Sequence, residues 1–427
     1  MSMTPPRPPR AAPLLPDGVD VLVAPPPYEA CTLADKLLVY ASSLIVVGSP
    51  LWFYGGILYL YRRWRRYRAL ASSHSKGGRD VGGDDPAVPT ESYTSSGESS
   101  QERPDGSHWR AQYGKLALKY GAALAVMLVV SVWGPHRSRR LGERLGARNW
   151  RLWDAWLNYV GFTVLRDRGA SGAASLPPPD GRQFDVRTSP AIFAFVPHGI
   201  FPFGLAFSCL PRRGYEGTWG PFRPVVATAT QLFPLVRTFI AWMGGVDASK
   251  AAVSSALRSG AGPRRLGISP GGIAEMFETY PKPGFHPDDE AALLRHRTGI
   301  FKLALEHDVP IVPVYCFGAT KMFRRVQLPH FVETLSRALK LSLCLLFGEL
   351  GLPIAFRQRM MYVVGNTIWP LAAAHGGGGD GAGGAASGAE FERRVRDMHD
   401  AFCGEVTRIF DRNKAYYGWE NKTLRLV

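Results

Sequence analysis

The sequence predicts an α/β domain built on a mostly parallel sheet flanked by helices, with N-terminal membrane-embedded helical segments before it. From residue 148 onward, short apolar runs alternate with helical patterns, which is typical of parallel strands joined by crossover helices. Two long uncharged segments precede this region, and clustered arginines follow each of them. The chain has 427 residues, but its polar and low-complexity stretches add little core, so we expect one large domain with appendages.

Composition divides the residues before this domain into four segments: 1–35, 36–68, 69–118 and 119–136. The first is Pro-rich and the third is rich in Ser, Gly, Asp and Glu, so both are predicted to be disordered. The second contains the uncharged run Leu37–Tyr61, which predicts a membrane helix or, because Gly48-Ser49-Pro50 interrupts it, a re-entrant hairpin. The fourth holds a shorter uncharged run and is predicted to enter one leaflet without crossing.

The basic residues indicate a membrane partner and not a nucleic acid. Lys and Arg exceed Asp and Glu by 51 minus 35, or 16, and much of this excess lies at Arg62–Arg68 and between residues 137 and 151. Both clusters follow apolar segments, where they would attract anionic lipid, and the arginines after Tyr61 place the carboxyl end of the first segment in the cytosol. The aromatic and basic stretch Arg148–Leu157 predicts a helix at the lipid interface. Five scattered cysteines without a CxxC motif predict reduced thiols and no metal site.

The region 148–427 is predicted to form the catalytic domain. Its expected strands are Ala191–Val196, Val225–Ala229, Leu266–Ser269, Ile311–Phe317 and Met361–Val364. A helix is expected at Gly299–His307 and a Gly-rich insertion at 372–389. Apolar residues then recur every three or four positions from Phe391 to Ile409, which predicts an amphipathic helix packed back on the domain.

The first predicted strand ends in Val196-Pro197-His198-Gly199. Ligands bind outside the carboxyl ends of parallel strands, so His198 is a candidate general base. The alternative is a histidine packed in the turn, with one ring nitrogen bonded to a carbonyl.

A second motif, Gly271-Gly272-Ile-Ala-Glu275, follows the strand at Leu266–Ser269. Backbone N–H groups at the two glycines would attract a phosphate or an oxyanion. Glu275 could serve in catalysis, or it could merely complement the dipole of the helix that begins here.

The same stretch matches G-x-S-x-G, the nucleophile elbow of serine hydrolases, at Gly267–Gly271. The residue after Ser269 is Pro270, which lacks the N–H that an elbow needs for its oxyanion hole. A serine esterase is therefore the weaker interpretation.

Taken in order, these motifs resemble the type 2 diacylglycerol acyltransferase family, which is related to the lysophospholipid acyltransferases. The stretches that carry the resemblance are Val196–Gly199, Phe233–Arg237, Gly244–Lys250, Gly271–Glu275, Arg297–His307, Val312–Gly318 and Val364-Gly365. The resemblance covers the chain from about residue 148 to the end. It implies an acyltransferase-like fold and an acyl-CoA:diacylglycerol O-acyltransferase at the endoplasmic reticulum membrane. Its catalytic domain would face the cytosol, and lipid droplets would be a further location.

The resemblance implies direct transfer with no metal and no cofactor, because acyl-CoA is a substrate. His198 would be the base and Glu275 would orient its ring, while the backbone of Gly199, Gly271 and Gly272 would bind an oxyanion or phosphate. The candidate contacts of the acyl-CoA phosphates are Arg297, Lys302, Lys321, Arg324 and Arg325, or these form an ordinary solvated face. The second substrate would be diacylglycerol in the bilayer, and the question of a homo-oligomer stays open.

Three positions depart from the family pattern. Val196 replaces the first histidine of the usual His-Pro-His-Gly, and Ala319 replaces a Glu that often follows Phe-Gly. Related acyltransferases have an acid five residues after the histidine, where this chain has Phe203. Monoacylglycerol, a fatty alcohol or a lysophospholipid therefore remain alternative acceptors, and a non-catalytic lipid-binding protein is a further alternative.

Overall fold

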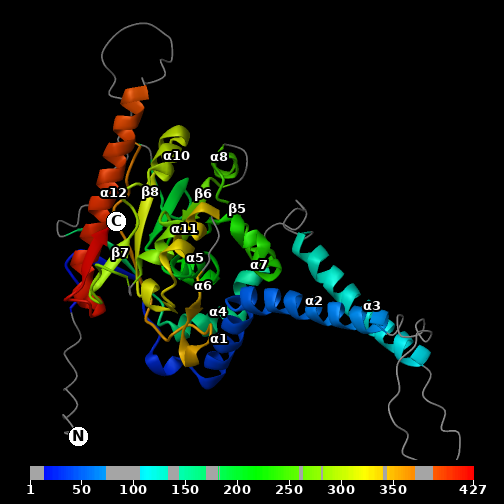
Figure 1. Ribbon diagram of the computed structural model, residues 1–427. Coiled ribbons are helices and arrows are strands. Elements are labelled where there is room, and N and C mark those ends of the chain that lie inside the picture. Colours follow the sequence, from blue (N-terminus) through cyan, green and yellow to red (C-terminus); the bar gives the residue numbers. More distant parts are fainter. Residues whose placement is uncertain are drawn as a thin grey trace, which may run out of the picture.

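The computed structural model describes residues 14–73, 106–132, 144–169, 181, 183–258, 263–279, 282–339, 344–370 and 388–427. Its centre is an eight-stranded sheet with the order β1-β2-β11-β8-β3-β6-β4-β5, covered by helices on both faces (Figure 1). Strand β1 is antiparallel to β2 and β8 is antiparallel to β11, whereas all other neighbouring pairs are parallel. The predicted mostly parallel α/β fold is confirmed.

The five predicted strands are present as β3, β4, β6, β8 and β11, whereas β1, β2, β5 and the strands of the small sheets were not predicted. Those of the large sheet are β1 Val19–Val23, β2 Thr163–Asp167, β3 Ala191–Val196, β4 Arg223–Val226, β5 Val246–Asp247, β6 Arg265–Ile268, β8 Ile311–Phe317 and β11 Met361–Val364. Two small sheets pair β9 Arg324–Arg325 with β10 Leu346–Phe347, and β7 Asp289–Ala292 with β12 Thr423–Leu426. Strand β4 begins and ends earlier than predicted, because residues 228–232 form a 3₁₀ helix.

The helices are α1 Leu33–Val46, α2 Ser49–Ser73, α3 Gly106–Val132, α4 Arg151–Tyr159, α5 Phe203–Cys209, α6 Arg212–Tyr215, α7 Pro234–Trp242, α8 Lys250–Leu257, α9 Gly272–Glu275, α10 Gly299–His307, α11 His330–Leu339 and α12 Gly388–Tyr417. Short 3₁₀ helices lie at Tyr28–Ala30, Leu145–Asn149, Thr228–Leu232, Met276–Glu278, Ala319–Lys321 and Glu349–Gly351.

Strand β3 lies in the middle of the domain and is buried along its whole length. Its side chains alternate between the two faces, so Phe193 and Phe195 pack under α4, α5 and α6. Ile192, Ala194 and Val196 pack on the other face with α8, α10 and α12. A strand covered on both sides reads as a continuous apolar run, which is why the sequence predicted it well.

Helix α12 packs across the second face, as its amphipathic pattern predicted. It is tied to the sheet through the buried side chain of Asp167 on β2, which accepts hydrogen bonds from Arg408 (2.9 Å) and Asn413 (2.7 Å). The charged partners and these bonds lower the pKa of Asp167 despite the desolvation that burial imposes on it.

The N-terminal region differs from its prediction in two ways. Residues 14–35 are not irregular, because β1 pairs with β2 and Thr32 caps α1. The predicted linker 69–118 is helical at both ends, in α2 and α3, and its central part lies outside the described residues. In the catalytic domain, the predicted insertion 372–389 lies outside the described residues, except for the two residues that begin α12.

Helices α2 and α3 form an antiparallel hairpin that extends away from the domain (Figure 1). Tyr67 stacks on Tyr113 and Tyr120, with ring centroids 6.2 and 5.5 Å apart. Within the described residues, Arg110–Val130 on α3 is long and apolar enough to cross a membrane, and α1 and α2 would pass the same test as one span bent by 50°. The predicted break at Gly48-Ser49-Pro50 is confirmed, whereas the second segment is longer than predicted.

The prediction that the aromatic residues of Arg148–Leu157 lie at the lipid interface is wrong for the two central tryptophans. Trp153 and Trp156 on α4 are buried within the protein. The indole N–H of Trp156 donates to Ser42 Oγ on α1 (3.1 Å), so these aromatics hold α1 against the domain and do not face lipid.

Candidate active site

His198 lies two residues beyond the end of β3, at the carboxyl edge of the sheet, as predicted. The next residue, Gly199, has a φ of +69°, and a Cβ there would lie 2.7 Å from the carbonyl oxygen of Ala319. Only glycine therefore allows the loop after β3 to pack against the loop after β8. These two strands are neighbours in the sheet, so their loops meet at the site.

The ring of His198 has a defined tautomer. Its Nδ1 lies 2.8 Å from the carbonyl oxygen of Gly199. Because a carbonyl oxygen only accepts hydrogen bonds, Nδ1 carries the proton of the neutral ring and Nε2 has the lone pair. Burial lowers the pKa of His198, which keeps the ring neutral at physiological pH. Nε2 is therefore able to accept a proton.

Within the described residues, Glu275 makes no hydrogen bond to this ring and instead accepts two backbone N–H groups. Its Oε2 accepts the backbone N–H of His198 (2.6 Å), and its Oε1 accepts the backbone N–H of Leu293 (2.8 Å). The carboxylate is 2% exposed, so it holds the loop after β3 and the loop after β7 together from inside the protein. The sequence offered no signal for Leu293, since a backbone N–H donor has no residue-type signature.

Desolvation by burial raises the pKa of Glu275 to about 7, although its two N–H donors and the nearby Arg297 oppose this rise. Gly271 makes room for the carboxylate, because a Cβ at that position would lie 2.1 Å from Oε2. The glycine therefore serves the packing of Glu275.

The backbone donors of the glycine motif are not equivalent. Gly272 has a φ of +58°, and its N–H donates to the carbonyl of Ser269 (3.1 Å). The N–H of Gly272 is therefore already bonded, whereas the sequence predicted that it would bind an anion. Among the described residues, the N–H groups of Gly199 and Gly271 have no hydrogen-bond partner.

Ser269 is not arranged as a nucleophile. Its Oγ is buried and has no hydrogen-bond partner in the described part of the chain. A serine nucleophile needs a base within hydrogen-bonding reach. This geometry and Pro270 both oppose the esterase interpretation.

The five candidate phosphate contacts separate into two groups. Three of them are already paired: Lys302 with Glu392 (2.6 Å), Lys321 with Glu290 (2.6 Å) and Arg325 with Glu333 (3.2 Å). Arg297 and Arg324 form no salt bridge with a described residue. Arg297 is also near enough to Glu275 to lower the pKa of that carboxyl, so it is the better placed of the two beside His198.

A buried acid that the sequence reasoning missed lies next to the site. Glu290 on β7 is 1% exposed, accepts the hydroxyl of Thr320 (2.6 Å) and is within 3.1 Å of Lys422. These contacts connect the loop after β8 with the C-terminal strand. The carbonyl of Val427 in turn accepts the N–H groups of Leu294 (2.9 Å) and Arg295 (3.0 Å), which shapes the segment that leads to Arg297.

The position where related enzymes carry an acid is apolar here. Phe203 is buried and contacts the rings of Phe201, Phe207 and Phe323, at centroid distances of 4.8, 5.1 and 5.7 Å. The chain that follows His198 thus leads into a buried aromatic cluster. Within the described residues, no group of three or more His, Cys, Asp or Glu side chains is placed to hold a metal ion.

Comparison with known proteins gives consistent matches. Residues 182–377 match the family model described as "Diacylglycerol acyltransferase". Acyl-CoA wax alcohol acyltransferase 1 of Mus musculus is 23% identical over 295 residues, which cover 66% of this chain and 78% of that protein. Diacylglycerol O-acyltransferase 2-like protein 6 of Bos taurus is 24% identical over 318 residues, 70% of this chain and 83% of that protein.

A third relative, 2-acylglycerol O-acyltransferase 1 of Bos taurus, is 25% identical over 294 residues, 65% of this chain and 77% of that protein. No solved structure matches the chain. The three relatives have names that specify different acceptors, so the match gives the reaction class and leaves the acceptor undecided.

Proposed function

This chain belongs to the diacylglycerol acyltransferase family, and on that premise we propose that it esterifies the free hydroxyl of diacylglycerol to form triacylglycerol. The chain is an acyl-CoA-dependent O-acyltransferase. The observation that carries the proposal is His198, a neutral imidazole at the carboxyl edge of the sheet with Nδ1 bonded to Gly199 and Nε2 unprotonated.

In the proposed reaction, Nε2 of His198 takes the proton of the acceptor hydroxyl while its oxygen attacks the thioester carbonyl of acyl-CoA. A C–O bond forms, and the carbonyl oxygen becomes an oxyanion that the N–H groups of Gly199 or Gly271 can stabilise. Collapse of this intermediate breaks the C–S bond. The leaving thiolate takes the proton from His198, so the base returns to its starting state and no acyl-enzyme forms.

Glu275 is a positioning residue in this scheme. It fixes the backbone of His198 at its N–H and links it to Leu293, so it sets where the imidazole lies relative to the substrate. The Gly199 carbonyl fixes the ring tautomer, which a carboxylate does in many other histidine bases. The absence of an acid at Phe203 is therefore compatible with catalysis.

Arg297 is the proposed contact for a phosphate of acyl-CoA, since its guanidinium has no salt-bridge partner among the described residues and lies near the carboxylate that holds His198. The aromatic cluster around Phe203 suits the apolar part of a lipid substrate.

The N-terminal helices associate the protein with a membrane. We place it at the endoplasmic reticulum, with the domain on the cytosolic side and lipid droplets as a further location. Arg110–Val130 is long enough to cross a bilayer only with basic residues such as Lys115 and Lys119 included. The uncharged parts, α2 from Ser49 and α3 after Lys119, have 13 residues each, a length of about 20 Å against the roughly 30 Å of a bilayer core.

The basic ends of both helices lie at the same, distal end of the hairpin, because Tyr54 and Val130 contact α7 at the other end. If the α2–α3 hairpin crossed the bilayer, its basic end would lie on the side opposite the cytosolic domain. The positive-inside rule disfavours this arrangement. The hairpin is therefore proposed to enter one leaflet, with the linker 74–105 and the catalytic domain on the same cytosolic side.

The test is an acceptor panel with purified protein in mixed micelles. Labelled acyl-CoA is offered with diacylglycerol, monoacylglycerol, a fatty alcohol or a lysophospholipid, and each ester is resolved by chromatography. Wild-type protein should show its highest kcat/KM with diacylglycerol, and His198→Ala should lose transfer to every acceptor. A higher kcat/KM with another acceptor would reassign the substrate but keep the mechanism. Equal activity of wild type and His198→Ala would remove the mechanism.

A further inference from the structure

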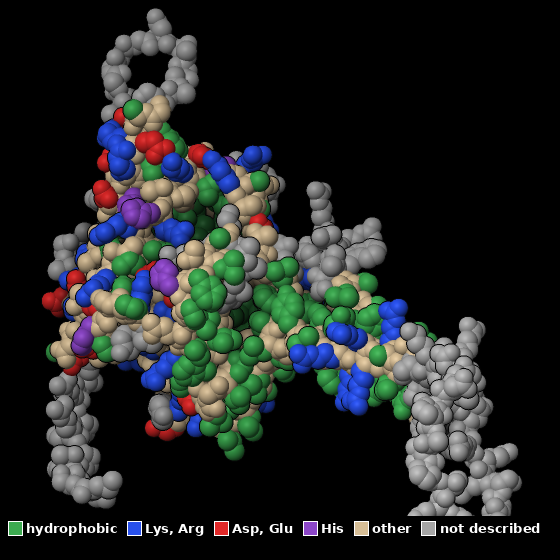
Figure 2. All heavy atoms as spheres, in the orientation of Figure 1, with side chains coloured by type: hydrophobic (Ala, Val, Ile, Leu, Met, Phe, Trp, Pro, Cys, Tyr) green, Lys and Arg blue, Asp and Glu red, His purple; other side chains and the backbone are tan. Residues whose placement is uncertain are grey.

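Exposed apolar side chains continue from the N-terminal helices onto the catalytic domain. Those on the helices include Leu37, Ile45 and Leu51, and the domain adds Leu235, Leu350 and Leu352. Figure 2 shows apolar side chains gathered over the region where α1, α2 and the domain meet. We name the domain segment Leu345–Leu352 the apolar loop.

The apolar loop lies directly beside the break between α1 and α2. Ser43 on α1 donates its hydroxyl to the carbonyl of Pro353 (2.9 Å) and accepts the N–H of Ala355 (3.2 Å). A Cβ at Gly48, in the break, would lie 3.2 Å from Pro353. Segments that are more than 300 residues apart in the chain are thus joined next to the helices that associate with the membrane.

The tip of this loop presents leucine at a position that disfavours it. Leu350 is 82% exposed and has a φ of +57°, in the left-handed region that few non-glycine residues adopt. In water, neither the exposure nor the backbone conformation of this leucine is favourable. Together with Leu345 and Leu352, which are also exposed, this leucine forms an apolar surface that contact with lipid would cover.

Much of the backbone of the loop is hydrogen-bonded internally. The N–H of Gly348 donates to Leu352 (2.7 Å), that of Glu349 to Ile354 (2.8 Å) and that of Leu352 back to Glu349 (3.0 Å). An irregular segment can enter lipid only when its polar backbone groups are bonded internally.

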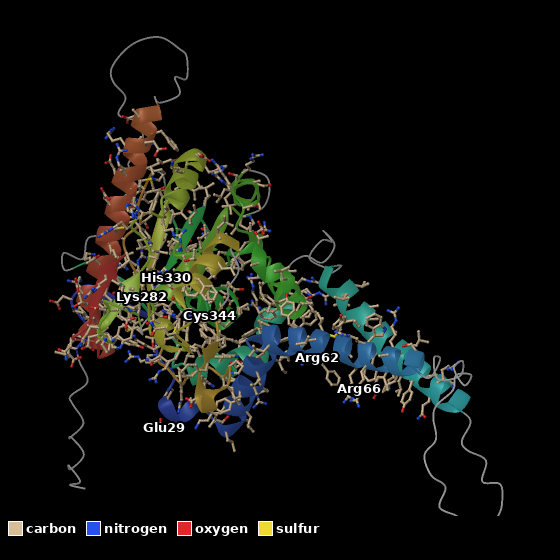
Figure 3. All side chains as sticks on the ribbon, in the orientation of Figure 1. Glu29, Arg62, Arg66, Lys282, His330 and Cys344 are labelled. Carbon is tan, nitrogen blue, oxygen red and sulfur yellow. The ribbon has the colours of Figure 1, made fainter. Side chains whose placement is uncertain are left out.

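We infer that the apolar loop inserts into the same membrane leaflet as α1 and the start of α2 and docks the catalytic domain on the bilayer through Leu350 and Leu352. The partner is a phospholipid surface, because the loop is continuous with the apolar helices and because α2 adds arginines, including Arg62 and Arg66 (Figure 3), that attract anionic headgroups. This inference does not depend on which acceptor the enzyme uses.

The apolar loop is also connected to the site. A Cβ at Gly348 would lie 3.3 Å from the ring of Phe323, and Phe323 stacks on Phe203, five residues after His198. Docking at this loop would therefore bring the aromatic cluster that follows His198 close to the bilayer surface, where a lipid acceptor lies.

The experiment measures membrane depth at single sites in the full chain. Cys344 and Cys403 are replaced by Ser, because the other three cysteines are buried, and an environment-sensitive fluorophore is attached at Leu350→Cys, Leu352→Cys or Leu14→Cys. Leu14 is the matched control, since it is 92% exposed and lies outside the apolar surface, before β1. The protein is reconstituted in vesicles of phosphatidylcholine and phosphatidylserine with or without doxyl-labelled lipid.

The labels at 350 and 352 should show blue-shifted emission and at least about twofold stronger quenching by doxyl lipid than the label at 14, as expected for residues within the acyl region. Equal quenching at all three sites overturns the inference. Blue-shifted emission in lipid-free micelles that rises with protein concentration also overturns it, because a second copy would then cover the loop.

A second variant separates docking from folding. Asn tolerates a left-handed backbone better than Leu, so Leu350→Asn should keep the thermal midpoint of the protein while lowering its kcat/KM for a bilayer-borne acceptor about threefold or more. Leu14→Asn should leave both unchanged. A folded Leu350→Asn protein with wild-type kcat/KM on vesicles would contradict a role of the loop in docking.

Discussion

Substitution of Glu275 by Gln separates two accounts of this residue. In a side-chain dyad, the variant would change only the chemistry of the imidazole. In the structure, the carboxylate instead accepts two backbone N–H groups, from His198 and Leu293. Gln keeps one oxygen acceptor but turns an NH₂ group toward the other N–H donor, so one of the two loops loses its partner.

The expected cost follows from these contacts. A hydrogen bond to a charged group contributes about 1.5–3 kcal/mol, and the donor left unpaired at this buried position adds to the loss. At neutral pH, the Gln variant avoids the cost of burying a charged carboxylate, which offsets part of this loss in stability. The rise of the Glu275 pKa from the ordinary 4.5 to about 7 corresponds to about 3 kcal/mol of folding free energy that is present below pH 4.5 and is lost as pH rises through 7.

The free energy of unfolding of wild type minus that of Glu275→Gln should therefore fall by about 3 kcal/mol between pH 4.5 and pH 8. It can be measured by denaturant titration in mild detergent. The matched control for the loss of a buried carboxylate is Glu333→Gln, an acid that pairs with Arg325.

Activity gives the second readout. The carboxylate form accepts both N–H groups, so kcat should rise with pH through about 7 in wild type, and this limb should vanish in Glu275→Gln. His198 itself should not give the limb, because burial lowers its pKa. The reasoning fails if Glu275→Gln retains a rise near pH 7, or if it loses activity with wild-type stability at every pH.

Replacing His198 by Ala should lower kcat by roughly 10² to 10⁴ while the thermal midpoint stays within a few degrees, and His307→Ala, before β8, serves as the matched control. Ser269→Ala should retain most activity, and a fluorophosphonate should not label Ser269 in the wild-type protein. Labelling at Ser269 would support the hydrolase interpretation. Arg297→Ala should raise KM for acyl-CoA about tenfold with little change in kcat, whereas Lys302→Ala, which loses only its pair with Glu392, should not. Protease added to sealed microsomes should cut the linker 74–105 without detergent, and protection of that linker would refute the single-leaflet orientation.

The sequence was most informative where one local rule dominates. Ile311–Phe317 and Met361–Val364 have the predicted bounds because strands buried on both faces need an uninterrupted apolar run. Gly299–His307 likewise has the bounds that its pattern predicted. The break at Gly48-Ser49-Pro50 was also visible in the chain, since glycine and proline act on the local backbone.

Prediction failed where long-range contacts decide the outcome. The tryptophans of α4 suited a lipid interface equally well, and only the packing of α1 against α4 buried them. Lys302 and Lys321 looked like anion contacts until their partners Glu392 and Glu290 were placed beside them.

Residue types in short, ordered patterns were enough to predict the central strands, the candidate base His198 and the resemblance to an acyltransferase family. The contacts of Glu275, in contrast, depend on how the chain folds. Its partners are the N–H groups of residues 77 and 18 positions away, and backbone donors are the same for every residue except proline. A pattern of side chains can therefore show that a carboxylate is present, whereas the folded chain alone shows which atoms it holds.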